Sequence, residues 1–167
     1  TSDATHFAVV FDKGKPTFRD DIYQEYKAHR PPAPDALVPQ FKFIRDAVRA
    51  FNLPSVEQAG FEADDLIATY AREFDGAVTI ISSDKDLMQI VSDRVTMYDT
   101  MRDRRIGHDE VVEKFGGAPD KVVDVLSLIG DPTDNVPGVP GIGAKIAAQL
   151  ITEYGDLETL LARVDEV

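Results

Sequence analysis

The chain has 167 residues, a formal net charge of −12 and a hydrophobic share of 43%, which is enough for a sizeable core. It contains no cysteine, so disulfides are excluded, and no apolar run reaches the roughly 18–20 residues that a membrane-spanning helix needs. The start has no basic stretch typical of a signal peptide. We therefore expect a cytoplasmic protein with one large domain, or a domain with a small appendage. Because the sequence begins with Thr1 and ends within an apparent helix, we expect a fragment of a longer protein.

The negative charge is concentrated in the middle of the chain. Residues 53–99 carry 3 basic and 10 acidic side chains within a pattern typical of a globular domain. Proteins that bind nucleic acid are usually basic, so this balance at first argues against such a partner. Divalent cations bound to several of the acidic groups would offset their charge and remove the objection.

The first two thirds of the sequence predict strands that alternate with helices. Short apolar runs predict strands at 7–11, 54–59, 78–81 and 95–98. Apolar residues at a 4-3-4-3 spacing predict an amphipathic helix over 37–51, and further helices are expected over 61–74 and 85–91. Residues 13–36 have no clear period and predict a functional loop or a short helical arch that is rich in basic residues.

After about residue 108 the pattern becomes entirely helical. Helices are predicted over 109–115, 119–130 and 142–154; Gly155 suits the end of the last one, and Asp156 can cap a final short helix. Strands that alternate with helices imply an α/β fold with a mainly parallel sheet between helices. The expected division is an α/β core at 1–107, with a basic arch or clamp at about 13–36, and a helical region at 108–167.

Eight carboxylates occur in four short clusters along the chain. They are Asp12; Glu62, Asp64 and Asp65; Asp84 and Asp86; and Asp131 and Asp134. Asp12 and Asp84 each follow an apolar strand, and ligands of open parallel sheets bind at the carboxyl ends of the strands. Carboxylates gathered from distant parts of a chain repel one another unless divalent cations neutralise them. We interpret the clusters as a site for divalent metal ions.

Each cluster also has an ordinary structural interpretation. Asp84 could cap the following helix, which explains it about as well as a metal does. The acids at 62–65 could complement the positive end of a helix dipole, although three acids in four residues exceed what a dipole requires. Asp131 and Asp134 flank a Pro-Thr pair and could simply form a turn.

Two further segments predict contacts with DNA. Residues 138–145, with the sequence GVPGIGAK, are typical of a helix-hairpin-helix at about 130–155, in which small residues let backbone amides approach phosphate; the alternative is an ordinary turn between helices. In the loop at 13–36, Lys27 and Arg30 are candidate contacts to the scissile phosphate, and Arg19 is a further candidate. Exposed basic residues more often belong to a plain solvated surface. Tyr26, like the other aromatic residues of this loop, could stack on unpaired bases or belong to the core.

Taken in order, these motifs resemble the 5′-nuclease (5′→3′ exonuclease, flap endonuclease) domain of bacterial DNA polymerase I. The resemblance covers essentially the whole chain, and the matching stretches are 9–12, 17–19, 26–32, 60–65, 83–87 and 129–145. It implies a PIN-like core with a mixed, mainly parallel sheet, followed by a helical helix-hairpin-helix region. It also implies a further strand upstream of this sequence, which carries one more metal-binding Asp.

The resemblance further implies the site residues. All eight carboxylates would bind two Mg²⁺ or Mn²⁺ ions directly or through water, and backbone carbonyls at the hairpin can hold a K⁺. Lys27 and Arg30 would steer or polarise the scissile phosphate. The residues expected to contact DNA are Arg19, Lys27, Arg30, Gly141, Gly143 and Lys145.

We therefore predict a structure-selective 5′→3′ exonuclease and flap endonuclease that hydrolyses DNA phosphodiesters by a two-metal mechanism. It would act on 5′ ends, flaps or nicks as part of bacterial DNA polymerase I in replication and repair, as a cytoplasmic, nucleoid-associated monomer whose polymerase domains lie in the same chain. One alternative is a non-catalytic DNA-binding fragment with an incomplete metal site. Another is a phosphohydrolase of small substrates, against which the hairpin and the basic loop argue.

Overall fold

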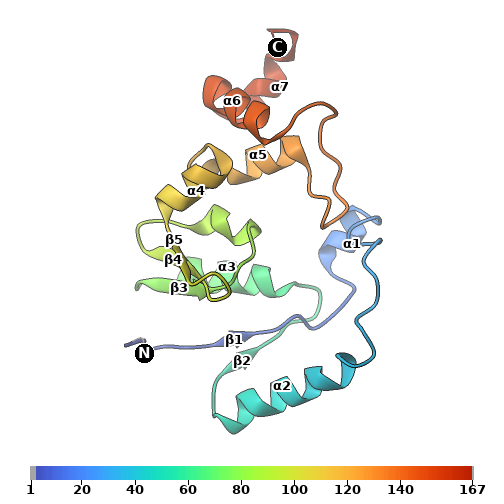
Figure 1. Cartoon of the computed structure of the whole chain (residues 1–167), viewed down its shortest axis with the longest axis vertical. Helices are drawn as coiled ribbons and strands as arrows, with labels where there is room; N and C mark the ends of the chain where they lie inside the picture. Colours follow the sequence, from blue (N-terminus) through green and yellow to red (C-terminus); the bar gives the residue numbers. More distant parts are fainter. Residues whose placement is uncertain (1–2, 167) are drawn as a thin grey trace. The chain divides into compact units, whose positions relative to one another are not determined.

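The computed structural model describes residues 3–166, and the chain forms two compact units, residues 1–67 and 68–167 (Figure 1). The boundary between them falls within helix α3 (Ala63–Glu73). Each unit contains its own small sheet. The predicted division near residue 107 stays a prediction.

The first unit contains two short parallel strands and two helices. β1 (Val9–Val10) pairs with β2 (Ser55–Val56), with Val9 opposite Ser55. These are the strands predicted at 7–11 and 54–59, although each is only two residues long. α1 (Phe18–Ile22) lies in the predicted arch segment, and α2 (Val38–Ala50) is the helix predicted over 37–51.

The apolar stripe of α2 is exposed. Phe41 and Ile44 of this stripe are 41% and 46% exposed, and the helix buries none of its residues. The 4-3-4-3 spacing predicted the helix correctly, although its apolar stripe is not buried.

The sheet of the second unit has three strands in the order β3-β4-β5. β3 (Val78–Ile81) pairs in parallel with β4 (Val95–Asp99), with Val78 opposite Val95. β4 pairs in antiparallel fashion with β5 (Arg104–Ile106). The sequence did not predict β5, because two of its three residues are arginines and no apolar alternation marks it.

Helices make up the rest of the second unit. η1 (Asp86–Ile90) is a 3₁₀ helix where an α-helix was expected over 85–91. The helices that follow are α4 (His108–Phe115), η2 (Pro119–Lys121), α5 (Val122–Ile129), α6 (Ala144–Tyr154), α7 (Leu157–Ala162) and η3 (Val164–Glu166). The carboxylate of Asp156 accepts a 2.7 Å hydrogen bond from the Thr159 amide, so the predicted cap of α7 is confirmed.

The core of the second unit lies between its sheet and its helices. Met97 of β4, Val111 of α4, and Val122 and Val125 of α5 are fully buried. The parallel pairing of β3 with β4 and the helical region after residue 107 confirm the predicted α/β class. None of the helices within residues 3–166 has the length and apolar character that crossing a membrane requires.

Candidate functional site

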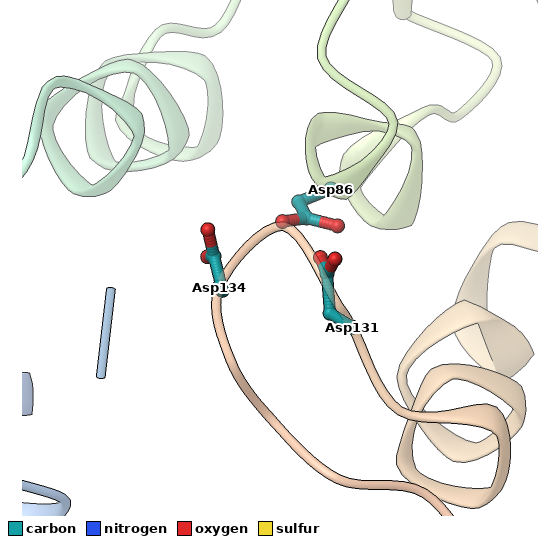
Figure 2. A group of neighbouring side chains, drawn as sticks. All are labelled: Asp86, Asp131 and Asp134. Atoms are coloured by element: carbon teal, nitrogen blue, oxygen red, sulfur yellow. The ribbon is translucent and has the colours of Figure 1, made fainter. Parts of the chain in front are cut away.

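Three of the predicted metal-binding carboxylates come together in the second unit. Asp86 lies at the start of η1, and Asp131 and Asp134 lie in the loop between α5 and α6 (Figure 2). One carboxylate oxygen from each lies within 4.8 Å of the others. Within residues 3–166 this is the only group of three or more side chains placed to share a metal ion. We call these residues the aspartate triad.

Backbone contacts fix the loop that carries Asp131 and Asp134. The Asp131 amide donates to the Val136 carbonyl at 2.8 Å, and the Val136 amide donates back to Asp131 at 2.9 Å. A Cβ on Gly130 or Gly138 would overlap the backbone of the other segment, so only glycine allows this close approach. The Asp131 Oδ1 also accepts a 2.8 Å hydrogen bond from the Thr133 amide, so the segment is a turn as well as a candidate site.

Asp86 has the chemistry of an unsatisfied ligand. Its Oδ1 is buried and has no hydrogen-bond partner in the described part of the chain. Burial raises the pKa of Asp86, and the negative charges of Asp84, Asp131 and Asp134 raise it further. Divalent cations such as Mg²⁺ take carboxylate oxygens as ligands, so a cation would satisfy this atom and offset the repulsion. The donor set therefore fits a divalent ion.

Asp84 serves a local structural role that the sequence also suggested. Its exposed carboxylate accepts a 3.0 Å hydrogen bond from the Asp86 amide. The bond orders the turn that enters η1, as a cap would. Asp84 is not one of the triad, but its charge acts on Asp86.

Sequence reasoning missed Lys85, which lies between these two aspartates. Its Nζ donates to Asp131 Oδ2 at 2.6 Å and lies 3.8 Å from Asp86 Oδ1. Burial lowers the pKa of Lys85, but the hydrogen bond to Asp131 and the charges of the neighbouring aspartates outweigh it, so the pKa is raised. Burial likewise would raise the pKa of Asp131, but the bonds from Lys85 and Thr133 hold it below its ordinary value. The sequence signal at Lys85 is its place between Asp84 and Asp86, which does not identify Asp131 as its partner.

The carboxylates of the first unit surround the start of α3. Asp12 Oδ1 accepts a 2.7 Å hydrogen bond from the Ala63 amide, and Asp65 Oδ2 accepts a 2.9 Å bond from the Glu62 amide. Asp64, half-buried, lies in the first turn of the helix. These contacts match the expected capping of a helix N-terminus. A role of the same residues in metal binding stays a prediction.

Two of the predicted DNA contacts in the first unit are bound to carboxylates. Lys27 Nζ lies 2.9 Å from both carboxylate oxygens of Glu62. The Arg19 guanidinium makes two hydrogen bonds to Asp65, at 2.7 and 2.8 Å. The Arg19 bond holds the pKa of Asp65 below its ordinary value, and the same bond raises the pKa of Arg19. Arg30, the third of these basic residues, is exposed.

Tyr26 belongs to the core rather than to a base-stacking surface. Tyr26 is only 8% exposed, and its hydroxyl donates to Glu62 at 3.0 Å. The suggestion that this ring stacks on bases is therefore wrong for the described conformation.

The predicted hairpin joins α5 to α6. Gly141 has a φ of +86°, a left-handed conformation that favours glycine. A Cβ at Gly141 or Gly143 would meet nothing within 4 Å, so a ligand could approach the backbone here. α6 begins directly after Gly143, and Lys145 in its first turn is exposed. The first amides of a helix have no intrahelical acceptors and are suited to binding phosphate.

Comparison with protein families gives two matches that together span the chain. The family model of the 5′-3′ exonuclease N-terminal, resolvase-like domain matches residues 1–116. That of the 5′-3′ exonuclease C-terminal SAM fold matches residues 117–167.

Individual proteins that match the chain include a DNA polymerase I, a 5′-3′ exonuclease and a flap endonuclease. DNA polymerase I of Rhizobium leguminosarum is 58% identical over 166 residues, which is 98% of this chain and 16% of the relative. The 5′-3′ exonuclease of Aquifex aeolicus is 42% identical over 93% of this chain and 55% of its own length. The solved structure of the bacteriophage T5 flap endonuclease with DNA and metal ions has a TM-score of 0.82 at 28% identity, over 96% of this chain and 64% of that one. The chain thus spans about one sixth of the length of the first of these relatives and about half of the second.

Proposed function

Because the chain belongs to the 5′-3′ exonuclease family, we propose that it is a structure-selective 5′ nuclease that depends on divalent metal ions. It would hydrolyse DNA phosphodiesters near a 5′ end or at the base of a 5′ flap. The observation that carries the proposal is the aspartate triad, in which Asp86 presents a buried oxygen without a hydrogen-bond partner among the described residues. A bound divalent cation would satisfy this oxygen, and the solved T5 flap endonuclease, a relative of this chain, was crystallised with metal ions.

Within this proposal all eight predicted carboxylates hold metal ions directly or through water. When bound, two Mg²⁺ or Mn²⁺ ions would activate the attacking water and stabilise the leaving 3′ oxygen. The triad offers ligands that are already gathered. The further proposed ligands are Asp12, Glu62, Asp64, Asp65 and Asp84.

The basic residues of the first unit would bind the DNA backbone. Lys27 and Arg30 would steer the scissile phosphate, and Arg19 would contact DNA nearby. Lys27 is held by Glu62 and Arg19 by Asp65, so each of these cations is already positioned by a carboxylate. Phosphate contacts fix the orientation of a protein on DNA without reading its sequence, which fits recognition of a 5′ end or flap by shape.

The hairpin would hold the duplex. The open backbone at Gly141 and Gly143 and the exposed Lys145 suit contacts to phosphate. Backbone carbonyls of the same hairpin would hold a K⁺ ion.

The relatives support a wider proposal about the whole protein. The chain would be the 5′-nuclease part of a bacterial DNA polymerase I that acts in replication and repair, with polymerase domains in the same chain. It would work as a monomer in the cytoplasm, with residues 1–107 as nuclease core and 108–167 as helical DNA-binding region.

A labelled flap duplex tests the proposal. We would incubate the chain with a DNA duplex that carries a labelled 5′ flap, in Mg²⁺ and in EDTA, and map the products on a sequencing gel. The proposal predicts Mg²⁺-dependent cleavage at or near the flap junction and no cleavage in EDTA. A substrate of the same sequence without a free 5′ end controls for non-specific nuclease.

Binding in Ca²⁺ separates the alternatives. Binding of the flap duplex without cleavage in Mg²⁺ would favour a non-catalytic DNA-binding fragment. Hydrolysis of a small phosphate ester without DNA binding would favour the phosphohydrolase alternative. If the chain neither binds nor cleaves the flap duplex, the proposed nuclease function is refuted.

A further inference from the structure

Lys85 occupies one of the two Asp131 oxygens that a metal ion could use. One Asp131 oxygen, Oδ1, is bound to the Thr133 amide at 2.8 Å. The other, Oδ2, accepts the 2.6 Å hydrogen bond from Lys85. The Thr133 amide leaves a lone pair on Oδ1, but a cation that uses Oδ2 must displace Lys85 or share that oxygen with an ammonium group.

The ammonium group also lies close to a second member of the triad. Lys85 Nζ is 3.8 Å from Asp86 Oδ1, the buried oxygen without a hydrogen-bond partner among the described residues. The side chains of Lys85 and Asp131 are 30% and 14% exposed, so solvent screens their interaction only in part. Lys85 thus supplies one positive charge to carboxylates that would otherwise repel one another.

From this geometry we infer that Lys85 is a built-in competitor of the divalent ion at the aspartate triad. Without metal it binds Asp131 and stabilises the gathered carboxylates. When a metal ion binds, Lys85 releases Asp131 and remains as a nearby like charge. Lys85 is thus a positioning residue. It weakens the affinity of the triad for metal, and it keeps the three carboxylates together when no metal is bound. The inference rests on the proposed metal-binding function of the triad.

The sign of the effect separates this role from a simple supporting one. If Lys85 competes, its removal destabilises the metal-free protein and strengthens metal binding. If Lys85 only holds Asp131 in place for the metal, its removal weakens metal binding. Repulsion between the Lys85 ammonium group and a bound cation sets the size of the effect. Two unit charges about 4 Å apart can change the affinity by more than about tenfold, even when solvent screens them substantially.

Three variants of the full chain test the inference. Lys85→Met removes the charge but keeps much of the side-chain length, and Lys85→Arg keeps the charge. Lys42→Met is the matched control, because Lys42 makes an ion pair of the same 2.6 Å length with Asp46 on the exposed face of α2 and is not a predicted site residue. Two quantities are measured. One is the equilibrium affinity for Mn²⁺ without DNA, obtained from the electron paramagnetic resonance signal of free Mn²⁺. The other is the melting temperature in EDTA.

We expect Lys85→Met to bind Mn²⁺ on the order of tenfold more tightly and to melt at a lower temperature in EDTA. Lys85→Arg and Lys42→Met should stay within about twofold of the wild-type affinity. Unchanged or weaker Mn²⁺ binding by folded Lys85→Met would overturn the inference. If that variant unfolds in EDTA, tighter binding should appear as recovery of its melting transition at lower Mn²⁺ concentrations than the wild type needs, and no recovery would equally refute it.

Asp134→Asn separates this inference from the proposed function. Loss of a bound Mn²⁺ in this variant, together with unchanged affinity in Lys85→Met, would refute only the role of Lys85. Unaltered Mn²⁺ binding by Asp134→Asn would instead refute the metal site itself.

Discussion

Replacing Asp86 by Asn should stabilise the protein in the absence of metal and weaken its stabilisation by metal. The Asp86 carboxylate is partly buried, lies near three other aspartates and has a raised pKa, so burial and repulsion outweigh the attraction of Lys85. Asparagine has nearly the same shape and carries no charge. The substitution therefore removes an unfavourable charge without leaving a cavity.

The expected magnitude follows from the exposure of the side chain. Asp86 is 34% exposed, and interactions between such partly solvated charges are worth about 0.2–1 kcal/mol. We expect a gain in free energy of unfolding of about 0.5–1 kcal/mol in EDTA, which corresponds to about 1–4 °C in Tm for a chain of this size. In Mg²⁺ or Mn²⁺ the order should reverse, because binding to the folded state stabilises the wild type more than the variant.

Thermal melting followed by circular dichroism measures both effects. Asp75→Asn is a suitable control, since Asp75 is exposed in the loop before β3 and is not a predicted ligand. The control should melt like the wild type with and without metal. If Asp86→Asn is less stable than the wild type in EDTA, the assignment of Asp86 as an unsatisfied ligand is refuted.

Three further predictions concern cleavage, DNA binding and pH. Asp84→Asn should abolish cleavage but keep or raise DNA affinity. Asn can still accept the hydrogen bond from the Asp86 amide, and the substitution removes a negative charge near the proposed phosphate position. DNA affinity that falls together with cleavage would contradict this. Lys145→Ala should weaken duplex binding and flatten its salt dependence by about one unit of slope, and an unchanged slope would exclude Lys145 from the interface. Although burial alone would raise the pKa of Asp99, its bonds from Arg102 and the adjacent amides hold the pKa below its ordinary value, so their stabilisation is present above about pH 4 and is lost as pH falls. Asp99→Asn should therefore lower Tm at pH 7, and the loss should shrink as the pH is lowered below about 4. A loss that does not change with pH would show that the charge is irrelevant.

The sequence predicted best the features that depend on local pattern. The spacing over 37–51 predicted α2, and the apolar runs predicted β3 and β4, because periodicity reports directly on helix and strand. The cap at Asp156 followed from its position before a helix. The sequence failed at β5 and at η1, where a three-residue strand and a 3₁₀ turn depend on neighbouring elements rather than on their own residues.

The candidate site could be predicted in its residues but not in its contacts. Clusters of acids pointed to Asp86, Asp131 and Asp134, and the structure places these three together. The hydrogen bond between Lys85 and Asp131 joins positions 46 residues apart, so no local pattern contains it. The same holds for Lys27 with Glu62 and Arg19 with Asp65, for which the sequence suggested DNA and metal as partners but not one another.

Sulfur substitution at the scissile phosphate tests most directly whether the protein cleaves DNA with metal ions held by its carboxylates. A flap duplex would carry sulfur in place of one non-bridging oxygen at the mapped cleavage position, and single-turnover rates would be measured in Mg²⁺ and in Mn²⁺. Mn²⁺ accepts sulfur ligands more readily than Mg²⁺ does. We predict that one sulfur isomer is cleaved much more slowly than the normal substrate in Mg²⁺ and that Mn²⁺ restores most of its rate. An equal sulfur effect in both metals, or cleavage that persists in EDTA, would contradict the account.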